Sequence, residues 1–323
     1  MKAAVVTRYG PPEVVEVRDV PTPEPGEGEV RVRAHVTTVS SGDSRVRALR
    51  VPRGMGLAVR LKFGWSAPKQ PILGVEAAGE VDAVGPGVER WQVGDRVVVS
   101  RGFDFGCHAE HVVVAQDGTL ARIPDGWSYA DAVALLFGGG TALTFFDLGK
   151  PVAGERILVN GASGAVGTMA VQLAKHRGLQ VTAVCSGANA ELVESLGADE
   201  VLDHTKVDVT RGADRYDLIM DTHGSTPFGR MKGQLKPGGR FLMVSGGLGA
   251  TIAAGWQKPV HTTGMNADPV GADAYEELMA LAGNGVLRPV IDRTVPLADI
   301  AEAHRRVDGG HKVGAVVVAL DGG

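Results

Sequence analysis

Hydrophobic and polar residues alternate over short runs in the first part of the chain, up to about residue 125. The run EVRVRAHVTTV at 29–39 has the two-residue period of a half-buried strand. Similar short runs follow it, with Gly and Pro between them. Several strands at such close spacing predict a small, partly open β-barrel.

The pattern changes after residue 128 to strand, glycine turn, helix and strand. RILVN at 156–160 precedes a segment in which apolar residues recur at helical spacing until Gly178. Further strands are predicted at 179–185, 216–222 and 240–247. This alternation predicts an α/β unit with a doubly wound parallel sheet covered by helices. The apolar positions of the predicted helix are Val166, Met169, Ala170, Leu173 and Ala174.

The last part of the chain, from Leu287 to Leu320, returns to strand, short helix and strand. It can complete the first domain, which predicts two domains with the strand–helix unit inserted in one of them. We place the N-terminal part of the first domain at 1–127 and the inserted domain at 128–268. A connecting helix and the C-terminal part of the first domain occupy 269–323.

A glycine-rich turn joins the strand at 156–160 to the following helix. In a dinucleotide fingerprint, three glycines permit a tight turn, backbone approach to a pyrophosphate and close helix–strand packing. Those places hold Ala162, Gly164 and Gly167. Alanine suffices at the first place if its φ is negative, and the helix start still offers N–H groups to a phosphate. The turn predicts cofactor binding, with a purely structural turn as the alternative.

The end of the next strand distinguishes NAD from NADP. An NAD site needs Asp or Glu about 20 residues beyond the glycines to bind the ribose 2′-hydroxyl. AVCSGANAE at 183–191 offers Ser186 and Asn189 there, whereas Glu191 lies further along the next helix. An uncharged pocket rich in donors favours NADPH over NADH. The alternative is that SGAN only caps a helix.

Composition narrows the class of protein. A formal net charge of −4 and a pI near 6.1 give no reason to expect a nucleic-acid partner. Two cysteines, Cys107 and Cys185, cannot form a disulfide framework. The N-terminus lacks a signal-peptide core, and the longest apolar stretch, 132–146, is short and interrupted. We expect a cytoplasmic protein with no stable membrane insertion.

The order of these segments resembles the zinc-free, quinone oxidoreductase-like branch of the medium-chain dehydrogenase/reductase superfamily. The resemblance covers essentially the whole chain and depends on motifs in a fixed order. They are PILGVEAAGEVDAVGPGV, VGDRVVV, HAEHVVV, GGTALTF, GERILVNGASGAVG, SLGADEVLDHT, YDLIMDT, LKPGGRFLMVSGG and GGHKVGAVVV. The branch usually carries an A-x-x-G-x-x-G-type turn, which agrees with Ala162.

The resemblance implies a GroES-like barrel built from both chain ends, an inserted Rossmann domain that binds NADPH, and a homodimer. The chain differs from the branch at four positions. It has Ser40 where the branch often has Asn, Ala188 where a basic residue is frequent, His204 where Tyr is frequent, and Ala315 where Lys is frequent. These departures imply weaker binding of the 2′-phosphate than is usual. The positions that match cofactor-lining places are Ser40, Thr141, Ser163, Gly164, Ala165, Val166, Ser186, Asn189, His204, Ser245 and Gly246.

Zinc is not expected. A structural Cys₄ site needs four thiolates and the chain has two cysteines. The family's catalytic Cys and His positions correspond to Ser40 and Val75, which leaves Glu76. CHAEH at 107–111 holds three potential ligands, but in a strand Cys107 and His111 lie about 13 Å apart at ~3.3 Å per residue. We therefore expect a packed thiol and exposed imidazoles there.

Without a metal, alcohol oxidation lacks its usual Lewis acid. We therefore expect NADPH-dependent hydride transfer to an electrophilic quinone or α,β-unsaturated carbonyl compound, with hydrogen-bond donors for the oxygen that gains charge. Ser40, Asp43 and Thr141 are the predicted catalytic residues, with His108 a further candidate. Each has a structural alternative: Asp43 as a helix cap, Thr141 as a helix-start hydroxyl, and His108 as a surface strand residue.

Three other functions remain open. They are an NAD(H)-dependent zinc-free alcohol or aldehyde reductase, a non-catalytic NADPH-binding sensor, and an S-adenosylmethionine-binding Rossmann protein.

One basic stretch of the chain has no assigned role. Between Ser44 and Val75 there are seven Lys and Arg residues and no Asp or Glu, and the stretch also carries Met55, Leu57, Leu61, Phe63 and Trp65. This stretch is either a solvated helix and loop, or a lid that accepts lipophilic substrates and attracts anionic groups or a membrane surface.

Overall fold

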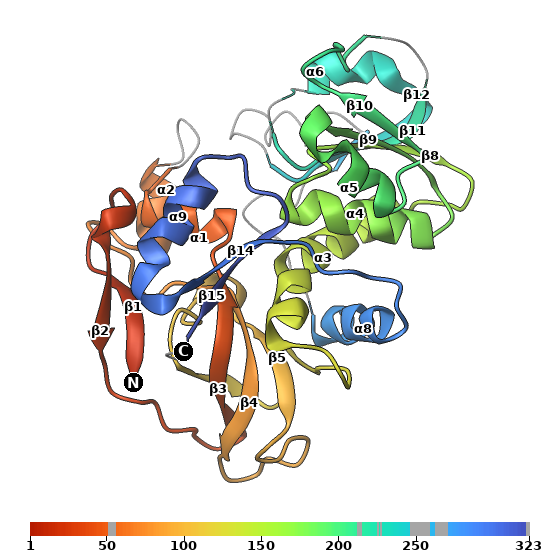
Figure 1. Cartoon of the computed structure of the whole chain (residues 1–323). Coiled ribbons are helices and arrows are strands. Elements are labelled where there is room, and N and C mark those ends of the chain that lie inside the picture. Colours follow the sequence, from red (N-terminus) through yellow and green to blue (C-terminus); the bar gives the residue numbers. More distant parts are fainter. Residues whose placement is uncertain are drawn as a thin grey trace. The chain divides into compact units, whose positions relative to one another are not determined.

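The computed structural model describes residues 1–50, 56–211, 215–224, 226, 228–245, 259–261 and 271–320. The chain folds into two compact units. The first comprises Met1–Phe137, Pro269–Gly285 and Pro289–Gly323, and the second comprises Gly138–Asp268 and Val286–Arg288. Helix α3 (Tyr129–Gly149) contains the point at which the chain leaves the first unit (Figure 1).

The first unit is built on a mostly antiparallel sheet in the order β14-β15-β3-β4-β5-β7, with β6 also paired to β3. The last strand of the described chain, β15, pairs antiparallel with β3, so both ends of the chain share one sheet. A separate hairpin joins β1 and β2. The strands are β1 (Lys2–Val6), β2 (Val15–Asp19), β3 (Glu29–Thr38), β4 (Glu76–Val84), β5 (Arg96–Ser100), β6 (His111–Ala115), β7 (Leu120–Arg122), β14 (Ile291–Pro296) and β15 (Ala315–Ala319).

Strand β3 confirms the alternation predicted from the sequence. Val30, Val32, Ala34 and Val36 are buried, while the residues between them are partly or fully exposed as far as His35. Val30, Val32 and Ala34 pack with valines of β4, β5 and β15 in one apolar core. The predicted strand, helix and strand near the C-terminus are also present, as β14, α9 (Ile300–Asp308) and β15.

A buried ion pair connects two helices of the first unit. Arg47, at the end of α1 (Ser41–Arg47), is fully buried, and its Nη2 donates to Asp308 Oδ2 of α9 at 2.6 Å. Arg47 also donates to the carbonyl oxygen of Gly10. The other helical elements of this unit are η1 (Pro12–Val14), α2 (Gly56–Phe63), η2 (Gly102–Asp104), α8 (Ala272–Gly283) and η5 (Leu297–Asp299).

The second unit contains a parallel sheet in the order β10-β9-β8-β11-β12-β13. Numbered from the first strand of the unit, this order is 3-2-1-4-5-6, the Rossmann arrangement. The strands are β8 (Arg156–Asn160), β9 (Gln180–Cys185), β10 (Glu200–Asp203), β11 (Tyr216–Asp221), β12 (Leu235–Met243) and β13 (Val260–His261). The helical elements are α4 (Ala165–His176), η3 (Gly187–Asn189), α5 (Ala190–Ser195), α6 (Phe228–Met231) and η4 (Lys232–Gln234).

Helix α4 confirms the helical pattern read from the sequence. All five predicted apolar positions are buried. The helix ends just before Gly178, whose φ of 75° lies in the left-handed region that glycine tolerates. Strand β12 begins at Leu235, five residues before the strand predicted at 240–247, because the structure continues the strand through the Pro–Gly–Gly segment.

Helix α3 is longer than the apolar stretch noted in the sequence. It is long and apolar enough, by length and composition, to cross a membrane. In the structure 72% of its most apolar window is buried inside the protein. The high hydropathy of α3 is therefore equally typical of a helix that is buried in the core of a protein.

Candidate functional site

The turn between β8 and α4 has the geometry of a phosphate-binding loop. Gly161 has a φ of 83°, whereas Ala162 has no positive φ, as the sequence interpretation requires. Helix α4 begins at Ala165, and Gly164 precedes it without a side-chain cap. The first N–H groups of the helix are therefore available to a ligand, and the helix dipole favours an anion there.

Gly164 and Gly167 are needed for different reasons. A Cβ at Gly167 would lie 2.2 Å from the carbonyl oxygen of Gly161 and 2.6 Å from Ala162 Cα, so close helix–strand packing requires glycine. A Cβ at Gly164 would meet only the Gly161 carbonyl oxygen, at 3.5 Å, which is an ordinary contact. The protein itself does not require glycine at 164. The small residue leaves the backbone open to a bound group, as a pyrophosphate requires.

The expected ribose-binding residues lie together at the end of β9. Asn189 Nδ2 lies 3.2 Å from Ser163 Oγ and 3.2 Å from Ser186 Oγ. These contacts connect the phosphate loop to the segment after the next strand. None of the three side chains carries a charge, so the group does not repel a 2′-phosphate. The side chain of Asn189 does not cap α5, so the structure does not support the alternative that this residue only caps a helix.

Two charged residues at this edge were not identified from the sequence. A Cβ at Gly187 would lie 2.5 Å from Asp203 Oδ2 and 4.0 Å from Lys206 Nζ, so both side chains lie beside the loop after β9. Hydrogen bonds from the side chain and backbone of Thr205 hold the pKa of Asp203 below its usual range. Lys206 Nζ lies 3.6 Å from Asp203 Oδ2. His204, which is predicted to line the cofactor, lies between Asp203 and Lys206 in the sequence, and its side chain is exposed.

The centre of the site lies where β8 and β11 end, at the point where the strand order reverses. Asp221 is 2% exposed, and burial raises the pKa of its carboxyl group. Its Oδ1 accepts from Asn160 Nδ2 at 2.9 Å and from Gly224 N at 3.0 Å. Ligands of open α/β sheets bind beside such a reversal, outside the carboxyl ends of the strands.

Ser245 follows β12 at the same edge, and a Cβ at Gly224 would lie 2.7 Å from its carbonyl oxygen. Thr141 is half-buried in α3, one turn after Gly138, where a Cβ would lie 2.1 Å from the Ala165 carbonyl oxygen. Gly246 is outside the described residues. The structure thus places Ser163 to Val166, Ser186, Asn189, His204 and Ser245 at the carboxyl edge of one sheet, and a dinucleotide fits this set.

In the first unit, Ser40 and Asp43 form a capping box at the start of α1. Asp43 Oδ2 accepts from Ser40 N at 2.8 Å and from Ser40 Oγ at 2.6 Å, and Ser40 Oγ accepts from Asp43 N at 3.2 Å. Asp43 Oδ1 also accepts from Gly74 N at 3.0 Å. Both side chains are buried. The structure therefore gives Asp43 the capping role that the sequence offered as its alternative, and a catalytic role for the two residues stays a prediction.

The prediction for residues 107–111 is wrong in two respects. The strand begins only at His111, so Cys107 and His108 precede it. His108 is 1% exposed rather than on the surface, and its Nε2 lies 2.9 Å from the carbonyl oxygen of Thr38. Cys107 is the packed thiol expected, and burial raises its pKa to about 12. His111 is half-buried, with Nε2 3.2 Å from Asp82 Oδ2.

Glu76 and His304 are buried ionisable groups that the sequence did not distinguish. Glu76 Oε1 accepts from Thr38 Oγ1 at 2.5 Å, and burial raises the pKa of this carboxyl group to about 8. Within the described residues, neither ring nitrogen of His304 has a hydrogen-bond partner. Burial, with His108 and Arg47 nearby, lowers the pKa of His304 well below its ordinary value. Burial therefore disfavours the charged form of both groups.

The donor set at the family's catalytic-zinc position does not fit zinc. Ser40 Oγ is already engaged with Asp43, and the buried side chain of Val75 has no donor atom. Glu76 alone offers a carboxylate, which is fewer than the three protein ligands of a catalytic zinc site. Across the part of the chain that the structure describes, no group of three His, Cys, Asp or Glu side chains is placed to hold a metal ion.

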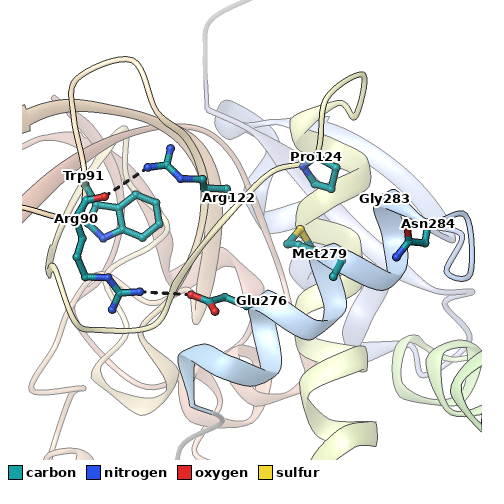
Figure 2. A pocket seen from close by; sticks show the side chains of 9 residues that line it. Arg90, Trp91, Arg122, Pro124, Glu276, Met279, Gly283 and Asn284 are labelled. Carbon is teal, nitrogen blue, oxygen red and sulfur yellow. Dashed lines mark hydrogen bonds and ion pairs between the residues drawn. The ribbon is translucent and has the colours of Figure 1, made fainter.

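A pocket of about 550 Å³ lies elsewhere in the first unit, between the loop before β5, the segment around Pro124, and α8. Figure 2 shows Arg90, Arg122 and Trp91 on one side and Met279 on the other. Arg90 pairs with Glu276 at 3.5 Å, and Arg122 pairs with Asp95 at 2.5 Å. The pocket contains none of the predicted site residues, and its arginines already have acidic partners. We assign it no ligand.

A parallel sheet with this strand order and a glycine turn at its reversal point is typical of a dinucleotide-binding domain. Comparison with known proteins indicates the same class of protein. Residues 26–125 match the family model "Alcohol dehydrogenase GroES-like domain", and residues 196–318 match "Zinc-binding dehydrogenase".

The chain is 31% identical to a quinone oxidoreductase of Pseudomonas aeruginosa, over 96% of this chain and 97% of that protein. It is 28% identical to the chloroplastic NADPH-dependent alkenal/one oxidoreductase of Arabidopsis thaliana, over 98% of this chain and 79% of that protein. The solved structure of the quinone oxidoreductase from Coxiella burnetii superposes with a TM-score of 0.86 at 27% identity, covering 99% of both chains. The chain belongs to the quinone oxidoreductase-like branch of the medium-chain dehydrogenase/reductase superfamily, and it is an oxidoreductase.

Proposed function

We propose that this protein is an NADPH-dependent reductase that delivers hydride to a quinone or an α,β-unsaturated carbonyl compound without zinc. The observation that carries the proposal is the edge of the Rossmann sheet. There, an open glycine at 164 and a helix start meet the uncharged ribose-end side chains of Asn189, Ser163 and Ser186. The carboxylate beside this loop, that of Asp203, is paired with Lys206. The relatives named quinone oxidoreductase and alkenal/one oxidoreductase support the acceptor class.

In the proposed complex the N–H groups at the start of α4 bind the pyrophosphate, and Gly164 lets it approach the backbone. Ser186 and Asn189 donate hydrogen bonds at the ribose end, and Lys206 supplies a positive charge to the 2′-phosphate. Thr141, His204, Ser245 and Gly246 complete the proposed cofactor site within a Rossmann domain at 128–268. The bound nicotinamide supplies the hydride.

The proposal requires no metal because quinones and conjugated carbonyls are already electrophilic. The chain's part is to hold the acceptor, exclude water and donate hydrogen bonds to the oxygen that gains charge. Thr141 carries a hydroxyl group suited to that donation. The single hydroxyl proton of Ser40 is donated to Asp43 Oδ2 at 2.6 Å, so Asp43 orients Ser40, and Ser40 can donate to the acceptor only in place of that hydrogen bond. Asp43 is therefore proposed as a positioning residue.

The test is a screen of NADPH oxidation with benzoquinones, naphthoquinones, enals and enones, with NADH assayed in parallel. We expect turnover with at least one acceptor class, a preference for NADPH, and no loss of activity after treatment with a zinc chelator. The matched control is Gly164→Val, which places a larger side chain where the phosphate approaches. NADPH binding without oxidation of any acceptor would support a sensor, and no NADPH binding would support the S-adenosylmethionine alternative.

The proposal extends to a cytoplasmic homodimer formed through edges of the Rossmann sheet. Within the described residues the sheet ends in the two-residue strand β13, whose pairing on one side is with β12. Exposed sheet edges of this kind pair readily with another strand. Light scattering of the purified protein at several concentrations tests the dimer, and a mass of one chain at all of them would contradict it.

A further inference from the structure

Helix α2, which Figure 1 labels in the first unit, carries apolar side chains that are exposed to solvent. Leu57 and Leu61 are 62% and 64% exposed, although burial is the usual place for leucine. At about 100° per residue they lie within ~40° of each other on the helix. Phe63, close to the opposite side, packs against the barrel core. The two leucines therefore form the outward ridge of a helix that is anchored by its other face.

One further exposed aromatic residue extends this ridge. Trp65 follows α2, four positions after Leu61, and is 64% exposed. We call Leu57, Leu61 and Trp65 the apolar surface of α2. Phe103 in η2 is also 53% exposed, but its ring centroid lies 5.9 Å from that of Phe63, on the side of the helix away from the leucines.

Cations surround this surface. On the helix, Arg60 and Lys62 project on opposite sides of the leucine ridge. The guanidinium carbon of Arg60 lies 5.9 Å from the Trp65 ring centroid, and Lys62 Nζ lies 5.1 Å from that of Phe103. Lys69 Nζ donates to the Leu61 carbonyl oxygen at 2.8 Å. Within the described residues none of these three cations forms an ion pair, and the nearby acidic residue is Asp104, beside Phe103.

We propose that the apolar surface of α2 binds the surface of an anionic lipid bilayer. Leucine and aromatic side chains insert at the boundary between headgroups and acyl chains, while flanking Lys and Arg bind the anionic headgroups. The unpaired cations favour this occupant over a second copy of the chain. A symmetric dimer through the same surface brings Arg60 and Lys62 of both copies together, and like charges repel.

The proposal does not depend on NADPH or on turnover, so it can be tested separately from the proposed function. The full chain is sedimented with vesicles of equal parts phosphatidylglycerol and phosphatidylcholine, and with vesicles of phosphatidylcholine alone. We expect binding to the anionic vesicles that weakens as salt rises, because salt screens the headgroup attraction.

Two variants separate the apolar and charged contributions. Leu61→Ser combined with Trp65→Ser, and separately Lys62→Glu, should each weaken binding about tenfold or more. The matched controls are Val93→Ser, which alters a 62% exposed valine elsewhere in the first unit, and Lys232→Glu in the second unit. Circular dichroism and thermal unfolding confirm that all variants are folded.

Three results overturn the proposal. They are no binding of the wild type to anionic vesicles, equal binding to both kinds of vesicle, and equal effects of the test and control substitutions. A concentration-dependent dimer that the Leu61 and Trp65 substitutions abolish would instead identify a second copy as the occupant.

Discussion

Asn189 Nδ2 lies 3.2 Å from Ser163 Oγ, so the segment after β9 contacts the phosphate loop after β8 through an uncharged side chain. In this family of sites the residue beyond the second strand decides between a ribose 2′-hydroxyl and a 2′-phosphate. The absence of charge on Asn189, Ser163 and Ser186 is what favours NADPH in the proposed function. Changing that charge is the most direct way to change the cofactor.

Asn189→Asp should lower the preference for NADPH over NADH. The substitution keeps the shape of the side chain but places a negative charge where the 2′-phosphate is proposed to bind. We expect the ratio of NADPH to NADH affinity to fall about tenfold or more, equivalent to ~1.4 kcal/mol. Calorimetric titration with both cofactors measures it. Asn284→Asp, an exposed change in the first unit, is the control, and an unchanged ratio for Asn189→Asp would place the 2′-phosphate elsewhere.

Lys206→Gln should weaken NADPH binding and leave NADH binding unchanged. Lys206 is 78% exposed on its side chain, so its attraction to a phosphate is screened and modest. We expect a loss of about three- to tenfold, equivalent to ~0.6–1.4 kcal/mol, together with a weaker dependence of NADPH affinity on salt. Lys236→Gln, which removes a lysine paired with Asp217, is the control. Equal losses for both cofactors would show that Lys206 acts on the loop rather than on the phosphate.

Gly164→Ala and Gly167→Ala should separate cofactor binding from stability. At 167 the added carbon lies 2.2 Å from a backbone oxygen, so we expect the free energy of unfolding to fall by about 2 kcal/mol or more. At 164 it meets only an ordinary contact, so we expect thermal stability close to wild type but weaker NADPH binding. Thermal unfolding without and with NADPH measures both effects. The interpretation fails if Gly164→Ala lowers stability as much as Gly167→Ala.

His304→Leu should remove part of the protein's sensitivity to acid. The pKa of His304 is lowered in the folded state, so below the ordinary value of 6.5 the unfolded chain gains a proton that the folded chain does not. The free energy of unfolding therefore decreases as pH falls below about 6.5, by up to ~1.4 kcal/mol per pH unit from this histidine. Denaturant unfolding at pH 7.5 and 5.5 should show a smaller difference for the variant. His176→Leu, at an exposed position, should behave as wild type.

The sequence predicts most of the second unit because its signals are local. The strand at 156–160, the glycine turn and the apolar positions of α4 lie within about 20 consecutive residues, and the structure confirms each of them. The regular alternation of strands and helices predicts the parallel sheet but not its strand order, because different doubly wound orders share this alternation. Ser163, Ser186 and Asn189 could be placed near one another because they follow adjacent parallel strands.

Features that depend on distant parts of the chain could not be predicted in this way. His108 was expected at the surface, because no local pattern reveals that Thr38, 70 residues earlier, lies against its ring. The raised pKa of Glu76 results from burial, which the local sequence does not show. Lys206 was overlooked because it follows the third strand of the sheet rather than the second. A search of all strand ends for cations would have found it.

The pairing of β15 with β3 also constrains how the protein is made. On the ribosome, the residues of β3 emerge early, but their partner at Ala315–Ala319 emerges almost three hundred residues later. The end of β3 at Val36–Thr38 must therefore wait for β15 during most of translation, although Glu29–Arg33 can pair earlier with β6. The parallel sheet of the second unit can form as soon as its own segment has emerged. We therefore expect the second unit to fold before the barrel of the first unit is completed.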